Sequence, residues 1–331
     1  MNDHEDATPT RAQDTVLVAG GAGFLGAHLC QRLLITGARV ICLDNMETGS
    51  VDRVEHLTAH PGFSVLEHDV IDPVPLDVPL THIYNLACPA SPRHYQADPP
   101  HTLLTCVYGA HNLLELARDN GARILQASTS EVYGDPQEHP QHESYHGNVN
   151  IVGRRSCYDE GKRCAETLFS DYGLHHQVEV KIARIFNTYG PGMTLDDGRL
   201  VSNLVIQALK GEPMTIYGDG SQTRSLCYVD DLIDGLVRLM DSPATFHGPV
   251  NLGNPHEATV LAIAEQIRTL TGTSSTLVHH PLPADDPHRR CPEIILAQNH
   301  LGWWPRMMLS DGLRHTIKDF STRLQHATVL Q

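Results

Sequence analysis

The chain has 331 residues, of which 19% are charged, and a formal net charge of −15 at pH 7. This charge disfavours nucleic acid and anionic membranes as partners, because both repel an acidic surface. No apolar run approaches the roughly 20 residues of a membrane-spanning helix. The composition is that of a globular protein large enough for one big α/β domain or two lobes.

The N-terminus, the cysteines and the histidines carry no signal for secretion or for metal binding. Residues 1–13 are polar and acidic without the apolar core of a signal peptide, so we expect a disordered tail. The eight cysteines form no C-x-x-C pair, which predicts reduced thiols in a cytoplasmic protein. The 22 histidines are scattered and no H-E-x-x-H motif occurs, so we expect no metal site.

A glycine-rich turn near the start of the chain is typical of dinucleotide-binding proteins. An apolar strand over 15–19 precedes it, Gly21, Gly23 and Gly26 stand in G-x-G-x-x-G spacing, and a helical pattern covers 24–36. Glycine permits the tight turn and the close approach of a pyrophosphate. The helix N-terminus then offers free N–H groups to the phosphates. This context of strand, turn and helix predicts a dinucleotide site.

A second strand, over 39–43, ends in an acidic residue at the position that selects the dinucleotide. Asp44 lies about 20 residues beyond the glycines, where a carboxylate binds both ribose hydroxyls of adenosine. Asn45 and Met46 follow instead of an arginine, so no cationic side chain is placed to bind the 2′-phosphate of NADP. We therefore predict NAD as the cofactor. The cofactor contacts expected in this region are Gly20, Gly23, Phe24, Leu25, Gly26, Asp44, Asn45, Thr48 and Gly49.

Three further strands are expected over 63–67, 81–87 and 122–128. Ligands bind at the carboxyl ends of the strands in an open parallel sheet, so the residues that follow these strands are candidates for the site. A Pro-rich loop with Ser, Arg and Tyr follows the fourth strand. The cofactor contacts expected at these ends are Asp69, Val70, Leu86, Ala87 and Ser128, and the expected substrate contacts are Pro89, Ser91 and Tyr95.

Strands and helices alternate up to residue 186, which predicts an α/β fold with a Rossmann-type doubly wound parallel sheet. We expect an NAD-binding domain over 14–186. The elements beyond it are shorter, and we expect 187–331 to form mainly a smaller substrate lobe, with the chain returning to the first domain. The other expected elements are helices over 101–119, 157–169, 199–210, 229–241 and 258–271 and a sixth strand over 177–185.

Tyr158 and Lys162 stand four residues apart on a predicted helix and therefore project from one face. A phenol with a pKa near ~10 is a poor base at neutral pH. A neighbouring ammonium, together with a positive nicotinamide ring, stabilises the phenolate and lowers that pKa. Tyr158 then becomes able to take a proton from a sugar hydroxyl while hydride leaves for NAD.

These motifs together resemble the extended short-chain dehydrogenase/reductase family, and within it the UDP-glucuronate decarboxylase (UDP-xylose synthase) branch. The resemblance covers roughly residues 14 to 320. The segments that carry it are Ala87–Pro92, Ser128–Gly134, Ser156–Arg163, Ala183–Pro191, Asp197–Asn203, Gly220–Arg224, Val250–Asn254 and Asp285–Arg290.

The resemblance implies a decarboxylation of UDP-glucuronate to UDP-xylose and CO2 with tightly held NAD and no net redox change. Tyr158, poised by Lys162, removes the C4 hydroxyl proton while hydride passes from C4 to NAD. The resulting β-keto acid loses its carboxyl group, C5 is reprotonated, and hydride returns to C4. The catalytic residues implied are Tyr158, Lys162, Thr129, Ser130, Glu131 and Arg290.

The resemblance also implies contacts to a nucleotide sugar in the second lobe, and a homodimer. The dimer is expected to form a four-helix bundle from the helices over 101–119 and 157–172. The substrate contacts implied are Asn187, Arg199, Val201, Tyr217, Gln222, Arg224 and Arg290.

For two of these cations, the residue type and its sequence context independently favour a role in substrate binding. A carboxylate substrate needs a cationic partner, and Arg290 follows an acidic turn, although a basic pair on the surface explains Arg289–Arg290 equally well. Arg224 suits a pyrophosphate by its charge and bidentate geometry.

Two alternatives remain open. A dTDP-glucose 4,6-dehydratase or a UDP-sugar 4-epimerase shares the fold, but a dehydratase usually carries Asp-Glu where this chain has Ser130-Glu131. A non-catalytic NAD-binding sensor is a different class of protein. It would not need Tyr158, Lys162 and Thr129 together.

Overall fold

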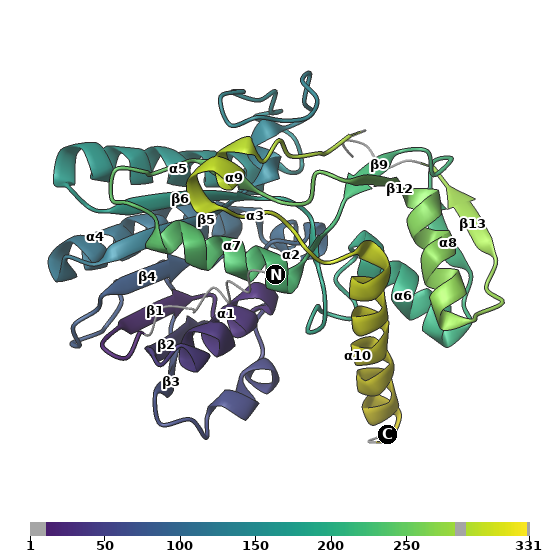
Figure 1. Ribbon diagram of the computed structural model, residues 1–331, viewed down its shortest axis with the longest axis horizontal. Coiled ribbons are helices and arrows are strands. Elements are labelled where there is room, and N and C mark those ends of the chain that lie inside the picture. The colour runs from purple at the N-terminus through teal and green to yellow at the C-terminus, as the bar shows by residue number, and fades with distance from the viewer. Residues whose placement is uncertain (1–10, 282–288, 330–331) are drawn as a thin grey trace, which may run out of the picture.

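A seven-stranded sheet forms the centre of the larger part of the molecule in the computed structural model, which describes residues 11–281 and 289–329 (Figure 1). All of its strand pairs are parallel, and the order is β11-β6-β5-β4-β1-β2-β3. The strands are β1 (Thr15–Ala19), β2 (Arg39–Asp44), β3 (Phe63–Glu67), β4 (His82–Asn85), β5 (Arg123–Thr129), β6 (Val180–Ile185) and β11 (Val250–Leu252).

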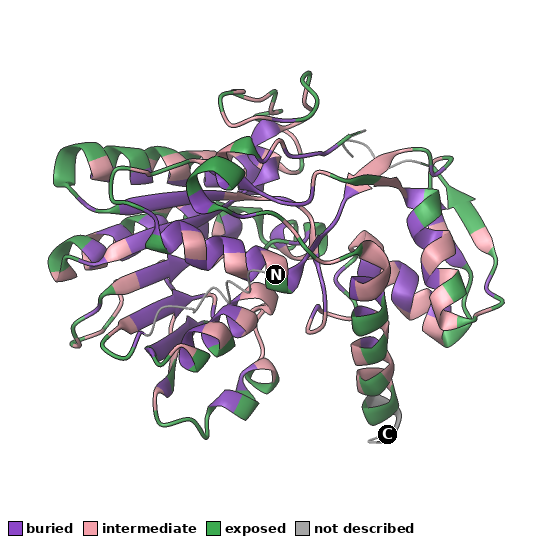
Figure 2. Ribbon diagram, viewed as in Figure 1, coloured by how far each residue is buried: buried purple, intermediate pink, exposed green. Residues whose placement is uncertain are grey.

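Helices cover both faces of this sheet, which is why its strands are apolar runs rather than alternating patterns. Two hydrophobic cores result, one on each face. Figure 2 shows the strands as largely buried, apart from the edge strand β3, and the outer faces of the helices as exposed. The predicted doubly wound Rossmann-type sheet is confirmed. One face carries α1 (Phe24–Ile35), α7 (Val229–Asp241) and α9 (Ile295–Leu301), and the other carries α3 (Pro99–Leu104), α4 (Ala110–Asn120) and α5 (Ser156–His176).

The helix predicted over 101–119 is interrupted in the structure. Its first part, α3, begins one residue after Asp98, whose carboxylate caps it by accepting from the N–H of His101 at 3.1 Å. A π-helical segment, η3 (Thr105–Gly109), then leads into α4. A Cβ at Gly109 would lie 2.6 Å from Cγ2 of Val70, so glycine lets this segment pack closely on the loop after β3.

The smaller lobe lies to the right in Figure 1 and is built from short sheets and three helices. The chain enters it after β6, returns to the large sheet for α7 and β11, and then enters it again. Its elements are α6 (Leu200–Lys210), β8 (Met214–Tyr217), β9 (Thr223–Ser225), β12 (Glu257–Thr259), α8 (Val260–Thr271), β13 (Leu277–His280) and α10 (Leu309–Val329). The remaining elements are η1 (Val51–Arg53), η2 (Glu55–Leu57), α2 (Pro92–Tyr95), η4 (Ser130–Tyr133), β7 (Thr188–Tyr189) and β10 (Cys227–Tyr228).

The described structure begins within the segment that the sequence predicted to be a tail. Residues 1–10 lie outside the described residues, but Arg11 is buried. Its backbone N–H donates to the carbonyl of Thr36 at 2.8 Å, and its guanidinium pairs with Asp14 and Asp241. The anchored part of the chain therefore starts earlier than residue 14. Among the described helices, none is long and apolar enough to cross a membrane.

Candidate active site

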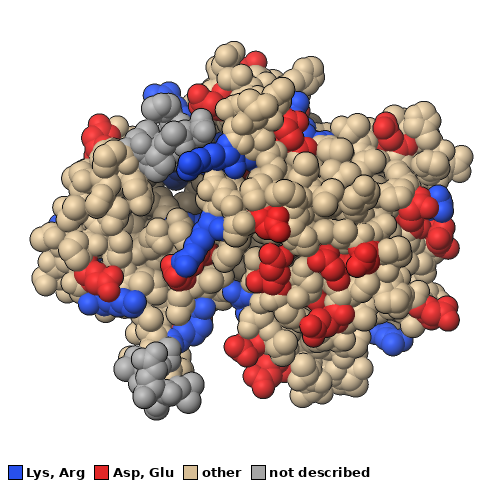
Figure 3. Space-filling model, turned by 180° about the vertical axis from the view of Figure 1, so that it is seen from behind, with Lys and Arg blue, Asp and Glu red and all other residues tan. Residues whose placement is uncertain are grey.

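A pocket of about 850 Å³ lies where the carboxyl ends of the strands meet the smaller lobe. Seen from behind, the surface is hollowed between the two lobes, and Lys and Arg side chains stand beside the hollow (Figure 3). The cations lining the pocket are Arg53, Arg154, Arg155, Lys162, Arg199, Arg224 and Arg290. This local positive charge, set against a net charge of −15, makes the pocket suited to an anionic ligand.

The glycine turn between β1 and α1 forms one wall of the pocket. Gly20 has φ +75°, and a Cβ there would lie 2.8 Å from the carbonyl carbon of Leu86 on the neighbouring strand end. A Cβ at Gly26 would overlap the carbonyl oxygen of Gly20. These positions therefore exclude side chains and leave room for a pyrophosphate at the start of α1, which fits a dinucleotide.

The glycines at the pocket differ from the predicted spacing. The G-x-G-x-x-G pattern begins at Gly21, but a Cβ there would lie 2.6 Å from Sγ of Cys42 and Gly21 does not line the pocket, whereas Gly20, Gly23 and Gly26 do. The pattern at the pocket is therefore G-x-x-G-x-x-G. Phe24, Leu25, Thr48, Leu86 and Ser128 line the pocket as predicted cofactor contacts.

Asp44 ends β2 with its carboxylate held by two backbone groups. It accepts from the N–H groups of Ala22 at 2.9 Å and Met46 at 3.0 Å. Burial raises the pKa of Asp44 above its ordinary value, and these N–H groups oppose that effect. A Cβ at Gly49 would lie 2.5 Å from Oδ1 of Asp44, so glycine is needed beside the carboxylate.

Seven predicted contacts do not line the pocket itself. The amide of Asn45 donates to Asp69 at 2.8 Å, and the other oxygen of Asp69 accepts from Ile71, so both are engaged with each other and their own loop. Val70 is buried against Gly109. The seven are Asp44, Asn45, Gly49, Asp69, Val70, Ala87 and Pro89.

Tyr158 and Lys162 lie together on α5, as their spacing predicted. The ring of Tyr158 stacks on Tyr95, with centroids 5.1 Å apart and planes 9° from parallel. Nζ of Lys162 donates to the carbonyl oxygen of Ala127 at 2.9 Å and lies 5.9 Å from the Tyr158 ring centre. Both side chains are therefore held in one orientation by β5 and by the loop after β4.

The electrostatics at Tyr158 differ from the sequence expectation. Burial raises the pKa of Tyr158 well above its ordinary value, and the nearby thiol of Cys88 adds to this effect. A hydrogen bond with Thr129 works in the opposite direction. The phenol is 7% exposed, so burial opposes the lowering of the pKa that the sequence predicts from Lys162 together with a positive nicotinamide ring.

Arg290 reaches the carboxyl end of β5 from a distant segment. It is 2% exposed, and Nη1 donates to the carbonyl oxygen and the hydroxyl of Ser130 at 2.5 and 3.2 Å. Nη2 donates to Gly134 at 3.0 Å and to Glu131 at 3.3 Å. Its buried Nε has no hydrogen-bond partner among the residues that the structure describes.

Glu131 pairs with a second arginine that the sequence analysis missed. Arg155 donates to the same Oε2 that contacts Arg290. Burial opposes ionisation of Glu131, but the guanidinium groups of Arg290 and Arg155 outweigh it and hold the pKa of Glu131 below its ordinary value. Glu131 is therefore a carboxylate at neutral pH. The only signal in the sequence was the position of Arg155 three residues before Tyr158.

Asp159 is a second residue that sequence reasoning missed. It is buried beside Tyr158, and within the described part of the chain its Oδ1 has no hydrogen-bond partner. Burial and the negative charge of Glu131 raise the pKa of Asp159 to about 7. Nothing in the local sequence distinguishes it from a solvated helix residue, because its burial depends on how α5 packs.

The smaller lobe supplies the opposite wall of the pocket. Gln222 donates to the carbonyl of Tyr217 at 2.6 Å, and Arg224 donates to the carbonyl of Thr223 at 2.8 Å. Nε of Arg199 lies 3.4 Å from Asp197 at the start of α6. The predicted substrate residues that line the pocket are Ser91, Tyr95, Asn187, Arg199, Val201, Tyr217, Gln222, Arg224 and Arg290.

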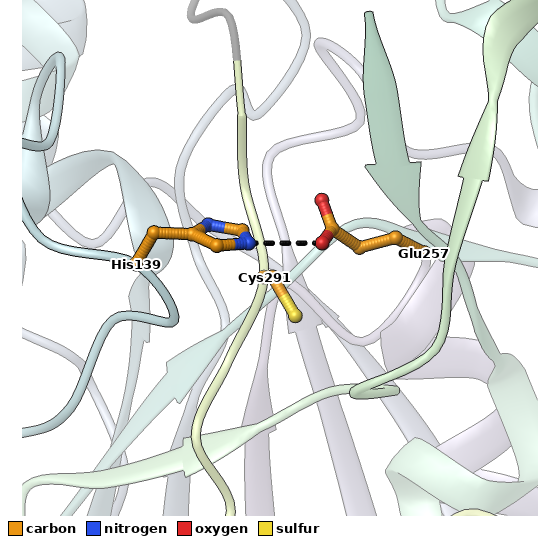
Figure 4. Close-up of side chains that lie close together, drawn as sticks. All are labelled: His139, Glu257 and Cys291. Atoms are coloured by element: carbon orange, nitrogen blue, oxygen red, sulfur yellow. Dashed lines mark hydrogen bonds and ion pairs between the residues drawn. The ribbon is translucent and has the colours of Figure 1, made fainter.

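A cluster of three side chains holds the segment that carries Arg290 (Figure 4). Nε2 of His139 lies 2.9 Å from Oε2 of Glu257 on β12, and the ligand atoms of His139, Glu257 and Cys291 all lie within 4.8 Å of one another. Cys291 also donates to the carbonyl of Pro255 at 3.3 Å. The loop before α5, the smaller lobe and Arg290 are thereby tied together.

Comparison with known proteins defines the class to which this fold and site belong. The model of the NAD dependent epimerase/dehydratase family matches residues 16–253. The chain belongs to this family of enzymes, and the predicted cofactor, NAD, is confirmed by that membership.

The most informative relatives narrow the class further. The chain is 53% identical to UDP-glucuronic acid decarboxylase 1 of Arabidopsis thaliana over 309 residues, 93% of this chain and 70% of the relative. It is 50% identical to UDP-glucuronic acid decarboxylase 1 of Danio rerio over 94% of this chain and 73% of the relative. The structure is similar to UDP-glucuronic acid 4-epimerase from Bacillus cereus in complex with UDP-glucuronic acid and NAD, with a TM-score of 0.84 and 26% identity over 93% of this chain and 99% of that one. The predicted resemblance to the decarboxylases is confirmed.

Proposed function

We propose that this protein decarboxylates UDP-glucuronate to UDP-xylose and CO2 through a 4-keto sugar, with hydride returned to C4 and no net redox change. The observation that carries the proposal is the buried Arg290, which faces Ser130 and Glu131 in the pocket that also contains Tyr158. A guanidinium with a free donor is the group that a substrate carboxylate requires. The names of the relatives support this choice.

The cofactor has a defined place in this proposal. Gly20, Gly23 and Gly26 would hold the pyrophosphate of NAD, and Asp44 would bind a ribose. When bound, NAD supplies a reversible hydride acceptor for C4 of the sugar. The remaining chemistry belongs to the side chains of the chain itself.

Tyr158 acts on the C4 hydroxyl as a general base and later as a general acid. Thr129 shares a hydrogen bond with its phenol, and the ammonium of Lys162 stabilises the phenolate. Once C4 is a carbonyl, it accepts the electron pair of the breaking bond to the carboxyl group. The charge that develops on this oxygen is stabilised by Tyr158 and Thr129.

Arg290, Glu131 and Ser130 act at the carboxyl end of the sugar. Arg290 orients the carboxylate before CO2 leaves, because its Nε is buried and unpartnered. Glu131, held ionised by Arg290 and Arg155, orients the ring and relays a proton to C5 through water with Ser130. The nucleotide half of the substrate is bound by Arg224, Arg199, Asn187, Tyr217 and Gln222 from the smaller lobe.

We also propose that residues 14–186 hold NAD and residues 187–331 mainly hold the nucleotide sugar. The same proposal includes a homodimer formed through α4, α5 and the segment before α4. Large apolar side chains are exposed on these elements, namely Leu103, Leu104, Tyr108 and Leu174. All eight cysteines are free thiols, which supports a reducing compartment such as the cytoplasm.

Proton NMR of the purified protein with UDP-glucuronate and catalytic NAD tests the proposed reaction. We expect UDP-xylose and CO2, without accumulating NADH. A UDP-4-keto-pentose with stoichiometric NADH would instead identify an oxidative decarboxylase. UDP-galacturonate would identify an epimerase, and turnover of dTDP-glucose alone would identify a dehydratase.

A further inference from the structure

Two thiols meet at the wall of the pocket beside the catalytic helix. Sγ of Cys88 lies 3.2 Å from Sγ of Cys106, and both residues are free cysteines. Cys88 follows β4 and lines the pocket, whereas Cys106 lies in η3 and is 2% exposed. One sulfur is therefore open to a molecule in the pocket, and the other stands directly behind it.

The pair is packed against the residues that carry the proposed chemistry. A Cβ at Gly161 on α5 would lie 3.1 Å from Sγ of Cys106, so glycine lets this thiol pack closely against the helix that carries Tyr158 and Lys162. Cys88 acts electrostatically on Tyr158, and Lys162 favours the thiolate of Cys88. A covalent bond that moves Cys88 therefore changes the surroundings of Tyr158 and Lys162.

We propose that Cys88 and Cys106 form a reversible disulfide with a small-molecule disulfide, such as glutathione disulfide, as oxidant, and that this bond switches the active site off. The two sulfurs need only move from 3.2 Å to the roughly 2.05 Å of a disulfide bond. The switching part of this inference rests on the proposed function, but formation of the bond does not.

The exchange proceeds in two steps. The thiolate of Cys88, reached through the pocket, attacks one sulfur of glutathione disulfide, forming a mixed disulfide and releasing one glutathione thiolate. The thiolate of Cys106 then attacks the Cys88 sulfur and releases the second glutathione. Two protein thiols are oxidised, one glutathione disulfide is reduced to two glutathiones, and the two thiol protons pass to them.

The different positions of the two thiols suit these roles. Burial raises the pKa of Cys88, but Lys162 favours its thiolate, and Cys88 is the thiol that lines the pocket. Cys106 is closed to solvent and its sulfur lies 3.2 Å from that of Cys88, so it is placed to resolve a mixed disulfide on Cys88. In the bonded form Cys88 is drawn toward η3 and away from the pocket wall.

The test exposes the purified protein to glutathione disulfide and follows three readouts together. These are the Cys88–Cys106 cross-linked peptide after alkylation and digestion, turnover of UDP-glucuronate, and NAD binding. We expect the cross-link to rise as turnover falls at least tenfold, and dithiothreitol to reverse both. Prior saturation with NAD and substrate is expected to slow the reaction, because they cover Cys88.

Two variants separate this pair from the other thiols. Cys106→Ala lies outside the pocket lining, so it is expected to keep basal turnover but stop at a glutathione adduct on Cys88. Cys164→Ser, which removes an exposed thiol on α5, is expected to switch like the wild-type chain. Oxidation elsewhere without the Cys88–Cys106 peptide would overturn the proposal, as would a complete cross-link with unchanged turnover.

The peptide map needs neither substrate nor variant, so it remains decisive if Cys106→Ala does not fold or if the proposed reaction is wrong. A protein that forms the cross-link but never turns over UDP-glucuronate would contradict the proposed function alone. In that case a loss of NAD binding on oxidation still supports the switch, and unchanged NAD binding overturns it.

Discussion

The ammonium of Lys162 lies 5.9 Å from the ring centre of Tyr158, one turn along the same helix, and donates to the carbonyl of Ala127. The lysine is therefore close enough to influence the phenol, yet burial still raises the pKa of Tyr158. Deprotonation of Tyr158 therefore depends on nearby positive charges that stabilise the phenolate.

Tyr158→Phe is expected to lower kcat by roughly 10²- to 10⁴-fold, the usual contribution of a positioned acid or base. Lys162→Met is expected to move the alkaline-rising limb of the kcat profile to higher pH, because loss of the ammonium disfavours the phenolate. Steady-state rates from pH 6 to pH 10 measure both. Tyr145→Phe, outside the pocket, is the matched control, and equal losses in Tyr145→Phe and Tyr158→Phe would contradict the assignment.

Asp44→Ala is expected to weaken NAD binding by roughly 10- to 150-fold, the equivalent of a charged hydrogen bond of about 1.5–3 kcal/mol. The carboxylate is already fixed by the N–H groups of Ala22 and Met46, so little ordering is needed when a ribose binds. Isothermal titration with NAD gives the dissociation constant. Asp52→Ala, an exposed change nearby, should bind NAD normally; an Asp44→Ala variant with wild-type affinity would remove Asp44 from the site.

Arg155→Met is expected to raise the pKa of Glu131, because one of the two guanidinium groups that lower it is lost. The pKa of Glu131 is depressed in the native protein. In the variant, Glu131 should therefore lose its negative charge at a higher pH than in the native protein. Turnover should therefore fall more at pH 6 than at pH 8. The measurement is the acidic limb of kcat/KM, with Arg268→Met as a remote control, and an unmoved limb would exclude Glu131 as the titrating group.

Asp159→Asn is expected to stabilise the protein more at pH 8 than at pH 4. The folded pKa of about 7 lies above the ordinary value of 3.8, so the folded state binds more protons between these values and loses stability as pH rises through them. The gain at pH 8 should be a few kcal/mol, since one pKa unit corresponds to about 1.4 kcal/mol. Urea unfolding at both pH values measures it.

The control for this change is Glu160→Gln, which removes the same charge from the neighbouring position of α5. Glu160 is only half-buried and lies 3.7 Å from Arg163, so its replacement should change stability little at either pH. If both variants shift stability equally, the effect belongs to net charge and not to the buried carboxyl group.

Tyr108→Glu is expected to convert the proposed homodimer to a monomer. Tyr108 is 50% exposed on η3, and a buried, unpaired carboxylate in a helical interface is costly. Light scattering at micromolar concentration gives the mass of both proteins. Val152→Glu, an exposed apolar position on the loop before α5, is the control, and a wild-type protein of monomeric mass would dismiss the dimer.

The local parts of this site were predictable from the sequence, and the parts made by distant contacts were not. The strand–turn–helix around Gly23, the position of Asp44 and the Tyr158–Lys162 spacing are short-range patterns. Whether Gly20 or Gly21 faces the ligand depends on Leu86, which comes from another strand. The G-x-G-x-x-G spacing begins at Gly21, whereas the glycines that line the pocket are the predicted contacts Gly20, Gly23 and Gly26.

Charge pairing and burial explain the remaining differences between the sequence prediction and the structure. Arg155 meets Glu131 across 24 residues, and Cys106 reaches Cys88 only because η3 interrupts the predicted helix. The raised pKa of Tyr158 follows from desolvation by the whole pocket, which no spacing reveals. The sequence predicts candidate residues, whereas the fold decides which of them come together and how strongly the pKa of each is perturbed.

The strand β11 has a consequence for how the protein is made. Its three residues, 250–252, pair with β6 and complete the sheet only after the chain has passed through the smaller lobe. A nascent chain that ends at residue 186 leaves the outer edge of β6 open, with unpaired N–H and C=O groups that recruit other strands. The last strand of the large sheet is therefore supplied only after the first segment of the smaller lobe has been synthesised. A gene fragment for an isolated NAD-binding half therefore has to carry residues up to β11.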